Sequence, residues 1–262
     1  MDNSTYTIRG LSFDYEDTRV LHDLDLTFAP GKLHAIVGPN GSGKSTLLDL
    51  MSGHRMPAQG TIELDTTPIA DHDPTELARL TALVPQEFDF NFPFTVREAV
   101  LMGRHPHIPR FSRPSSHDLA KVDMALKKTD TAHLADRALA ELSGGEKQRT
   151  VFARALAQDT PTLLLDEPTS SMDIRHALAA MTELKRLAHD ENRTIITVLH
   201  DLNLAAGFCD RIVMLNQGRI KAQGDPGETF TTEIIRDVFG VHANVIHSEN
   251  RLHISYGIKE LP

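Results

Sequence analysis

The segment from Gly38 to Thr46 constrains the fold of this chain more than any other. Its residues are, in order, Gly38, Pro39, Asn40, Gly41, Ser42, Gly43, Lys44, Ser45 and Thr46. Two glycines separated by four residues and followed by Lys and Ser match the phosphate-loop pattern. A short apolar run at 33–37 fits a buried strand before the loop, and the apolar stretch 46–51 has helical character. This order of strand, glycine loop and helix predicts an α/β nucleotide-binding fold.

The glycine loop is suited to holding phosphate groups. Glycines let the backbone wrap closely enough for its amides to reach phosphate oxygens, and the N-terminus of the following helix adds a favourable dipole. We expect Lys44 to reach the β- and γ-phosphates of a bound nucleotide and the Ser45 hydroxyl to hold Mg²⁺. The alternative is a glycine-rich turn with an unrelated lysine, and the strand and helix on either side make that a poor account.

Length, charge and cysteine content narrow the class of protein. The chain of 262 residues is long enough for one large α/β domain or for a main domain with a smaller insertion. A net charge of −9 disfavours a nucleic-acid partner. Cys209 is the single cysteine, which excludes an internal disulfide, favours a reducing cytosol and is best read as a small buried residue. With neither a membrane-spanning segment nor a signal peptide in the sequence, we expect a cytoplasmic protein whose membrane role, if any, is exerted through a partner.

Two adjacent acids follow a second buried-strand pattern. The apolar run 162–165 ends at Asp166 and Glu167. Because neighbouring side chains in a strand point to opposite sides, we expect the two carboxylates to have different roles. Asp166 can hold Mg²⁺ through water, and Glu167 can orient and polarise the nucleophilic water. Acids that merely begin a turn are the alternative, which a phosphate loop in the same chain makes remote.

A second helix start has the features of an anion site. Ser143 occupies the N-cap position of a predicted helix, and Gly144 and Gly145 leave its first backbone amides accessible. A simple capped helix is the alternative, although glycine in a first turn is otherwise unfavourable. One compact ATP site needs only one such helix start. The second therefore suggests head-to-tail pairing, in which Ser143 of one copy closes on the γ-phosphate held by Lys44 of the other.

Three isolated residues are weaker candidates, each with an ordinary alternative. Tyr15, at the edge of a predicted hairpin, can stack on a purine base or can be a plain strand aromatic. Gln86 ends the apolar run 82–85 and can coordinate Mg²⁺ and bond to the attacking water, although a solvated loop residue is the default. His200, at the tip of the β-branched run 194–199, can contact the γ-phosphate, whereas taken alone it would be structural.

The middle of the chain reads as a helical insertion. Helices are predicted at 96–102, 116–129 and 131–138. The loop at 103–111 contains two histidines, for which ordinary loop residues are preferred over metal ligands. Phenylalanines alternate with other residues at 88–94. They fit a half-buried strand or an aromatic surface that docks a partner, and the nearby glutamine favours docking.

These motifs occur in the order found in ATP-binding-cassette (ABC) ATPases, and the chain resembles that family over nearly its whole length. The resemblance rests on the phosphate loop 38–45, the glutamine loop at Gln86, the signature segment Leu142–Glu146, the acidic pair Asp166–Glu167 and the switch histidine His200. Tyr15 matches the adenine-stacking aromatic of the family. The segment Ser171-Met172-Asp173 departs from the usual Ala-Leu-Asp but keeps the aspartate, so only the packing of a dimer interface is affected.

The resemblance implies a P-loop NTPase core of ABC type, with an antiparallel β subdomain and an inserted helical subdomain at about 88–160. It implies an ABC ATPase domain over 1–240, a short C-terminal extension over 241–262, and ATP and Mg²⁺ held in a homodimer. The implied catalytic residues are Glu167, His200 and Gln86, and the implied metal ligands are Ser45, Gln86 and Asp166. The implied nucleotide contacts are Tyr15, residues 38–46, Ser143, Gly144, Gly145, Glu146 and Asp173.

A finer resemblance is to the ABC subunits that energise import of ferric siderophores, haem or cobalamin, and it rests on residues 103–107, 173–176 and 239–241. It implies integral membrane permease subunits as partners, a substrate-binding protein behind them, and a position at the inner face of the cell membrane without direct insertion. A short helix of each permease subunit would lie beside Gln86 and the surface at 88–94. The alternatives are a non-transport cassette in iron–sulfur assembly or on ribosomes, and a module that binds nucleotide without turnover.

Overall fold

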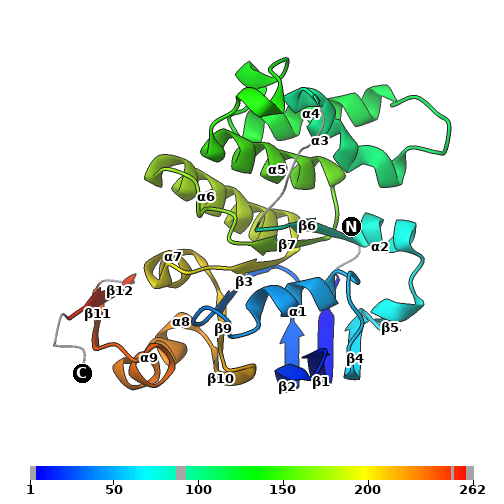
Figure 1. The fold of residues 1–262 in the computed structure, drawn as a ribbon. Coiled ribbons are helices and arrows are strands. Elements are labelled where there is room, and N and C mark those ends of the chain that lie inside the picture. Colours follow the sequence, from blue (N-terminus) through cyan, green and yellow to red (C-terminus); the bar gives the residue numbers. More distant parts are fainter. Residues whose placement is uncertain (1–3, 87–92, 249–250, 258–262) are drawn as a thin grey trace.

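A six-stranded sheet lies at the centre of the computed structural model, which describes residues 4–86, 93–248 and 251–257 (Figure 1). The strands, in the order β10-β9-β3-β8-β7-β6, are Arg219–Gly224, Arg211–Asn216, Lys32–Val37, Thr194–Val198, Thr162–Asp166 and Thr81–Val84. All neighbours are parallel except β10, which pairs antiparallel with β9. Strands β7 and β8 are buried along their whole length, which explains their continuous apolar and β-branched sequences.

A second, antiparallel sheet has the strand order β2-β1-β4-β5. Its strands are β1 (Tyr6–Tyr15), β2 (Thr18–Phe28), β4 (Gln59–Leu64) and β5 (Thr67–Pro68). Leu24, Leu26 and Phe28 of β2 are buried while Asp25 and Thr27 are exposed, as their alternation predicts. Helix α1 (Lys44–Met51) packs between this sheet and the central one, so that the phosphate loop is held by both (Figure 1). The β4–β6 connection contains the short helix η1 (Ile69–Asp71) and helix α2 (Pro74–Leu80).

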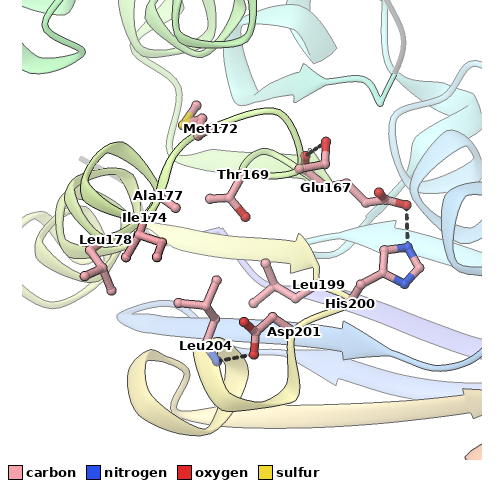
Figure 2. Close-up of a pocket in the computed structure, with 11 residues that line it drawn as sticks. Glu167, Thr169, Met172, Ile174, Ala177, Leu178, Leu199, His200, Asp201 and Leu204 are labelled. Atoms are coloured by element: carbon pink, nitrogen blue, oxygen red, sulfur yellow. Dashed lines mark hydrogen bonds and ion pairs between the residues drawn. The ribbon is translucent and has the colours of Figure 1, made fainter. Parts of the chain in front are cut away.

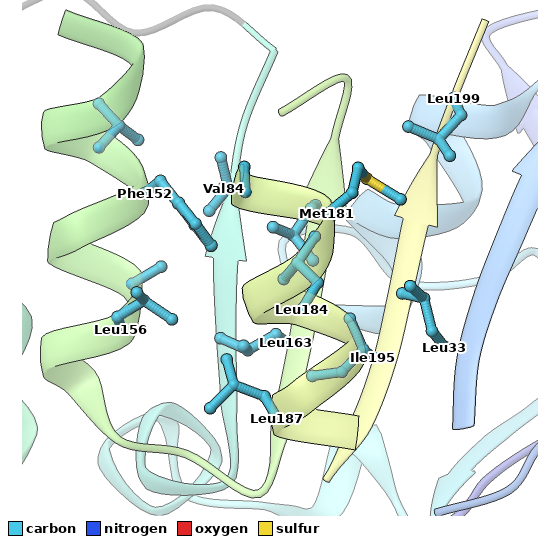
Figure 3. Packing of buried hydrophobic residues seen from close by; sticks show 14 of the residues in the cluster. Leu33, Val84, Phe152, Leu156, Leu163, Met181, Leu184, Leu187, Ile195 and Leu199 are labelled. Carbon is cyan, nitrogen blue, oxygen red and sulfur yellow. The ribbon is translucent and has the colours of Figure 1, made fainter. Parts of the chain in front are cut away.

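Helices (green in Figure 1) cover the side of the central sheet that lies away from the antiparallel sheet. They are α3 (Val96–Leu101), η2 (Met102–His107), α4 (Ser116–Lys128), η3 (Ala132–Leu134), η4 (Leu139–Glu141), α5 (Gly144–Gln158) and α6 (Ile174–Glu191). Figure 3 shows how α5 and α6 pack on the sheet: Phe152 and Leu156 of α5 face Val84 of β6, and Met181 and Leu184 belong to α6, which packs against β8 and β3. This buried layer gives the two helix starts a rigid support.

Two expectations for the helical region are wrong in detail. The helix expected at 131–138 is only the single turn η3, because Ala138 leaves the helical path and pairs with Thr95 in an isolated β-bridge. The loop expected at 103–111 begins as the 3₁₀-helix η2, which includes Pro106. Both differences arise from contacts with distant residues, which local periodicity does not report.

A buried ion pair joins η2 to α4. The Arg104 guanidinium donates to the Asp118 carboxylate at 3.0 Å and to the backbone carbonyl of Ala157 at 2.8 Å. Hydrogen bonds from the hydroxyl and the backbone N–H of Ser115 lower the pKa of Asp118 from 3.8 to about 2. The Arg104 guanidinium contributes to the same shift. The residues at 103–107 that resemble an importer subgroup therefore have a packing role in this chain.

We expect Asp118→Ala to lower the free energy of unfolding by about 3 kcal/mol, because it leaves the Arg104 charge buried and uncompensated. A folded-state pKa below the unfolded value means that this stabilisation is fully present above about pH 3.8 and is lost as the pH falls towards 2. Urea unfolding of both proteins at neutral pH and near pH 3 measures the two effects.

Asp123→Ala is the matched control, because Asp123 of the same helix pairs with Arg97 at 2.6 Å on an exposed surface. Its loss is expected to cost no more than about 1 kcal/mol. Equal losses for the two variants would show that the buried pair has no special role.

The last part of the chain packs beside the central sheet. Helix α7 (Leu202–Phe208) follows β8, and α8 (Pro226–Thr229) and α9 (Thr232–Phe239) lead to the strand pair β11 (Ala243–Ser248) and β12 (Arg251–Tyr256). Cys209 is buried at the end of α7, and burial raises the pKa of its thiol above the ordinary value. Within the described ranges, no helix has the length and apolar character needed to cross a membrane.

Candidate functional site

The glycine loop follows β3 and is held by close contacts that exclude larger residues. A Cβ atom at Gly38 would lie 2.0 Å from the carbonyl oxygen of Leu215, and one at Gly43 would lie 2.5 Å from the side chain of Leu21. Gly43 also has a left-handed backbone, with φ of 97°, and caps α1. These contacts explain why glycine is needed at both ends of the loop.

The Lys44 side chain lies over the loop. Its Nζ donates to the carbonyl oxygens of Gly38 at 2.9 Å and Pro39 at 2.8 Å. Burial lowers the pKa of Lys44, and the nearby carboxylates of Glu167 and Asp166 act in the opposite direction. The ammonium group is thus placed between the loop and the acidic pair.

A cavity of about 670 Å³ lies over the loop. The residues that line it are Val20, Asn40, Gly41, Gly43, Lys44, Ser45, Thr46, Gln86, Glu167 and His200. The structure therefore brings together side chains from the ends of β3, β6, β7 and β8, as the carboxyl ends of parallel strands require. Its volume is in the range of small-molecule and cofactor sites.

Asp166 does not itself line this cavity but is buried beside Ser45, which does. Burial raises the pKa of its carboxyl, while the Ser45 hydroxyl acts to lower it. Its Oδ1 atom is buried and has no hydrogen-bond partner among the described residues. The unpartnered Asp166 oxygen lies on a carboxylate beside the Ser45 hydroxyl, and Ser45 and the Gln86 amide both line the cavity. These groups fit the oxygen ligands that Mg²⁺ prefers.

Glu167 and His200 meet above the ends of β7 and β8. The Glu167 Oε1 and His200 Nε2 atoms are 2.5 Å apart, and the two side chains are 14% and 43% exposed (Figure 2). Glu167 has a left-handed backbone with φ of 49°, an uncommon conformation for a residue with a side chain. The two acids have different partners, His200 for Glu167 and Ser45 for Asp166, which is consistent with separate roles. Figure 2 shows that the pair also borders a smaller cavity of about 290 Å³ between α6 and α7.

Tyr15 is not among the described residues that line the large cavity. Its ring is 38% exposed and packs edge-on against Phe13, with centroids 4.9 Å apart. The Arg55 guanidinium lies 4.7 Å from the ring centroid, so one face of the ring is already in contact. Arg55 was not singled out from the sequence, where no local pattern links it to Tyr15.

The signature segment lies outside the large cavity, because neither Ser143 nor the two glycines line it. Ser143 and Gly144 are exposed at the start of α5. Glu146 forms a capping box with Ser143, and its Oε2 atom accepts bonds from the Ser143 backbone at 2.8 Å and hydroxyl at 2.7 Å. These bonds lower the pKa of Glu146. A Cβ atom at Gly144 would meet nothing within 4 Å, so the helix start is open to another molecule.

Asp173 has a similar capping role at the start of α6. Its Oδ1 atom accepts from the His176 backbone at 2.9 Å, and its carboxylate also bonds to the His176 ring. These bonds lower the pKa of Asp173. No sequence motif marks Gln148, which donates to the Glu167 carbonyl at 3.5 Å and so links α5 to the acidic pair.

A family model described as ABC transporter matches residues 21–170. The chain belongs to this family. Its resemblance to the ABC ATPases and its predicted fold class, a cassette fold with an antiparallel β subdomain and a helical subdomain, are both confirmed.

Relatives of this ABC protein include transport subunits. It is 45% identical to the hemin import ATP-binding protein HmuV of Nocardia farcinica, over 84% of this chain and 76% of that protein. It is 41% identical to the cobalamin import ATP-binding protein BtuD of Halobacterium salinarum, over 92% of this chain. The match spans only 60% of the length of that relative. These similarities confirm the finer resemblance to the haem and cobalamin import subgroup.

Solved structures agree with the fold. A metal-chelate-type ABC transporter in an inward-facing conformation gives a TM-score of 0.83 at 31% identity, covering 97% of each chain. The dimeric structure of the bacterial ABC transporter cassette MJ0796 gives 0.76 at 28% identity, covering 84% of this chain and 98% of that one.

Proposed function

We propose that this chain is the ATP-hydrolysing subunit of an ABC importer that takes up haem, cobalamin or an iron–siderophore. The observation that carries the proposal is the cavity in which the phosphate loop, Gln86 and the Glu167–His200 pair face one another. The names of the import relatives support the transport role. Within the chain, we assign residues 1–240 to the ATPase domain, with the helical subdomain inserted at about 88–160, and 241–262 to a C-terminal extension.

The chain's own residues account for binding and hydrolysis. Amides of the glycine loop and Lys44 hold the phosphates of ATP, and Glu167 orients and polarises the attacking water. His200 contacts the γ-phosphate in this proposal, which its bond to Glu167 and its position on the cavity of the phosphate loop support. Ser45, Asp166 and Gln86 would hold Mg²⁺, which supplies charge neutralisation at the phosphates when bound. A module that binds nucleotide without turnover would not need the Glu167–His200 pair.

A second copy of the chain completes the site in this proposal. Ser143 and Gly144 are exposed and lie outside the cavity that contains Lys44. Head-to-tail pairing gives both helix starts a phosphate to bind, and the MJ0796 cassette is dimeric. In such a pair, Asp173 and the capping box of Glu146 lie at the facing surface, and the exposed part of the Tyr15 ring stacks on adenine.

The partners in the membrane are permease subunits, reached without insertion of this chain. Gln86 is exposed and lines the cavity, so a segment docked beside it would be coupled directly to the ATP site. The aromatic surface expected at 88–94 lies, for residues 88–92, outside the described residues. The import relatives favour this arrangement over a cassette in iron–sulfur assembly or on ribosomes.

Transport assays test the proposal. Proteoliposomes that contain this chain with its permease and binding protein are expected to take up one of haem, cobalamin or a ferric siderophore only when ATP is enclosed on the side of the cassette. Lys44→Ala is expected to abolish uptake, because the phosphates lose their main cation. ATP hydrolysis that none of the three substrates stimulates would contradict the import role.

A further inference from the structure

The C-terminal strand pair is joined to the helix that follows the switch histidine. The side-chain amide of Asn203, in the first turn of α7, makes two bonds to the backbone of Ile254 in β12. Its Nδ2 donates to the Ile254 carbonyl at 3.0 Å, and its Oδ1 accepts from the Ile254 N–H at 2.8 Å. The amide thus acts as an additional strand neighbour for β12, which lies beside α7 in Figure 1.

Apolar packing supports this junction. Ile254 is 1% exposed and belongs to the same buried cluster as Leu199, Leu202 and Ala205, which lie on either side of His200. Val245 and Leu252 of the strand pair pack against that cluster. The strand pair is therefore part of the core around the start of α7.

His200 directly precedes the capped start of α7. Asp201 caps the helix, with its Oδ1 accepting from the Asn203 backbone at 2.8 Å and the Leu204 backbone at 3.1 Å. On the other side, Leu199 donates its N–H to the Ile36 carbonyl of β3 at 3.2 Å. The His200 side chain is 43% exposed, so contacts with neighbouring side chains restrain the ring only in part. Its orientation therefore depends mainly on the position of its backbone.

We propose that Asn203 is a positioning residue for ATP hydrolysis, which holds the start of α7 on the C-terminal strand pair and so keeps the His200 ring on Glu167. The inference rests on the proposed ATPase function. It gives the C-terminal extension a role at the active site, although none of its described residues lines the large cavity.

The test is a double-mutant cycle in the full chain. Asn203→Ala is expected to lower kcat for ATP hydrolysis roughly 10-fold, as small misplacements of catalytic groups do. KM for ATP should stay unchanged, because the phosphate loop is untouched. In a His200→Ala background the same change should have no further effect on kcat, because the residue that it positions is gone.

Two further variants separate positioning from loss of folding. Asn203→Asp keeps the size of the side chain and the acceptor but loses the donor to Ile254, so kcat should fall while the thermal unfolding midpoint stays close to wild type. Ser255→Ala is the matched control, since it removes only a bond within the strand pair, to the Asn244 carbonyl at 3.4 Å, and should leave kcat unchanged.

A normal kcat in Asn203→Ala, or an equal loss with and without His200, would overturn the inference while leaving the ATPase assignment intact. If the wild-type chain does not hydrolyse ATP and His200→Ala changes nothing, the proposed function itself fails and the inference falls with it.

Discussion

Glu167→Gln is expected to lower kcat for ATP hydrolysis by roughly 10²- to 10⁴-fold, the usual contribution of a positioned base. Gln has the same shape and can accept the His200 bond, but it cannot polarise the attacking water. ATP binding should persist, since Lys44 and the glycine loop are unchanged. The measurements are phosphate release at saturating ATP and the amount of nucleotide that remains bound after gel filtration.

A trapped pair of chains should accompany this loss. If ATP joins two copies and hydrolysis separates them, Glu167→Gln with ATP should elute at twice the mass of the nucleotide-free protein. Glu63→Gln is the control, because Glu63 lies in β4 and pairs at 3.6 Å with the exposed Arg9. Turnover at the wild-type rate in Glu167→Gln would contradict the assignment of this carboxylate.

Mixing two inactive variants should restore activity, because each site is proposed to take residues from two chains. Lys44→Ala damages the phosphate loop and Ser143→Arg blocks the exposed helix start, so each variant alone should be inactive. In a mixed pair, the intact loop of one chain faces the intact helix start of the other. Random pairing of equal amounts gives about a quarter of all sites intact under two-fold symmetry.

The expected result is therefore ATP hydrolysis at up to about a quarter of the wild-type rate in the equimolar mixture. The ratio of the two variants should be varied, with maximum activity at equal amounts. The control is each variant alone, at the same total protein concentration as the mixture. If no ratio of the two variants hydrolyses ATP, then Ser143 does not contribute to the ATP site of another chain.

The sequence predicts most of this site because its motifs are local. The phosphate loop needs glycines where the backbone of Leu215 and the side chain of Leu21 approach, and those glycines are visible as a pattern. Glu167 and His200 end adjacent parallel strands, so the topology brings them together once the strands are recognised. Metal ligation by Ser45, Gln86 and Asp166 remains a prediction, and the unpartnered Asp166 oxygen supports it.

The remaining contacts join residues that are far apart along the chain. Arg55 on the Tyr15 ring and Asn203 on the Ile254 backbone depend on how elements pack, and no spacing in the sequence reports either contact. The same cause explains the error at 131–138, where the bridge between Ala138 and Thr95 overrides helical periodicity. The segment 103–107 carries the resemblance to the importer subgroup, and the bonds from its Arg104 to α4 and α5 are a further contact that no spacing in the sequence reports.

The buried thiol of Cys209 has a practical consequence for labelling experiments that measure conformational change. It is the single cysteine of the chain, and burial keeps it in the unreactive protonated form at neutral pH. Fluorophores or spin labels attached through maleimide chemistry will therefore report on an introduced cysteine alone. The natural sequence can serve directly as the background for measuring distances between two labelled copies during the nucleotide cycle.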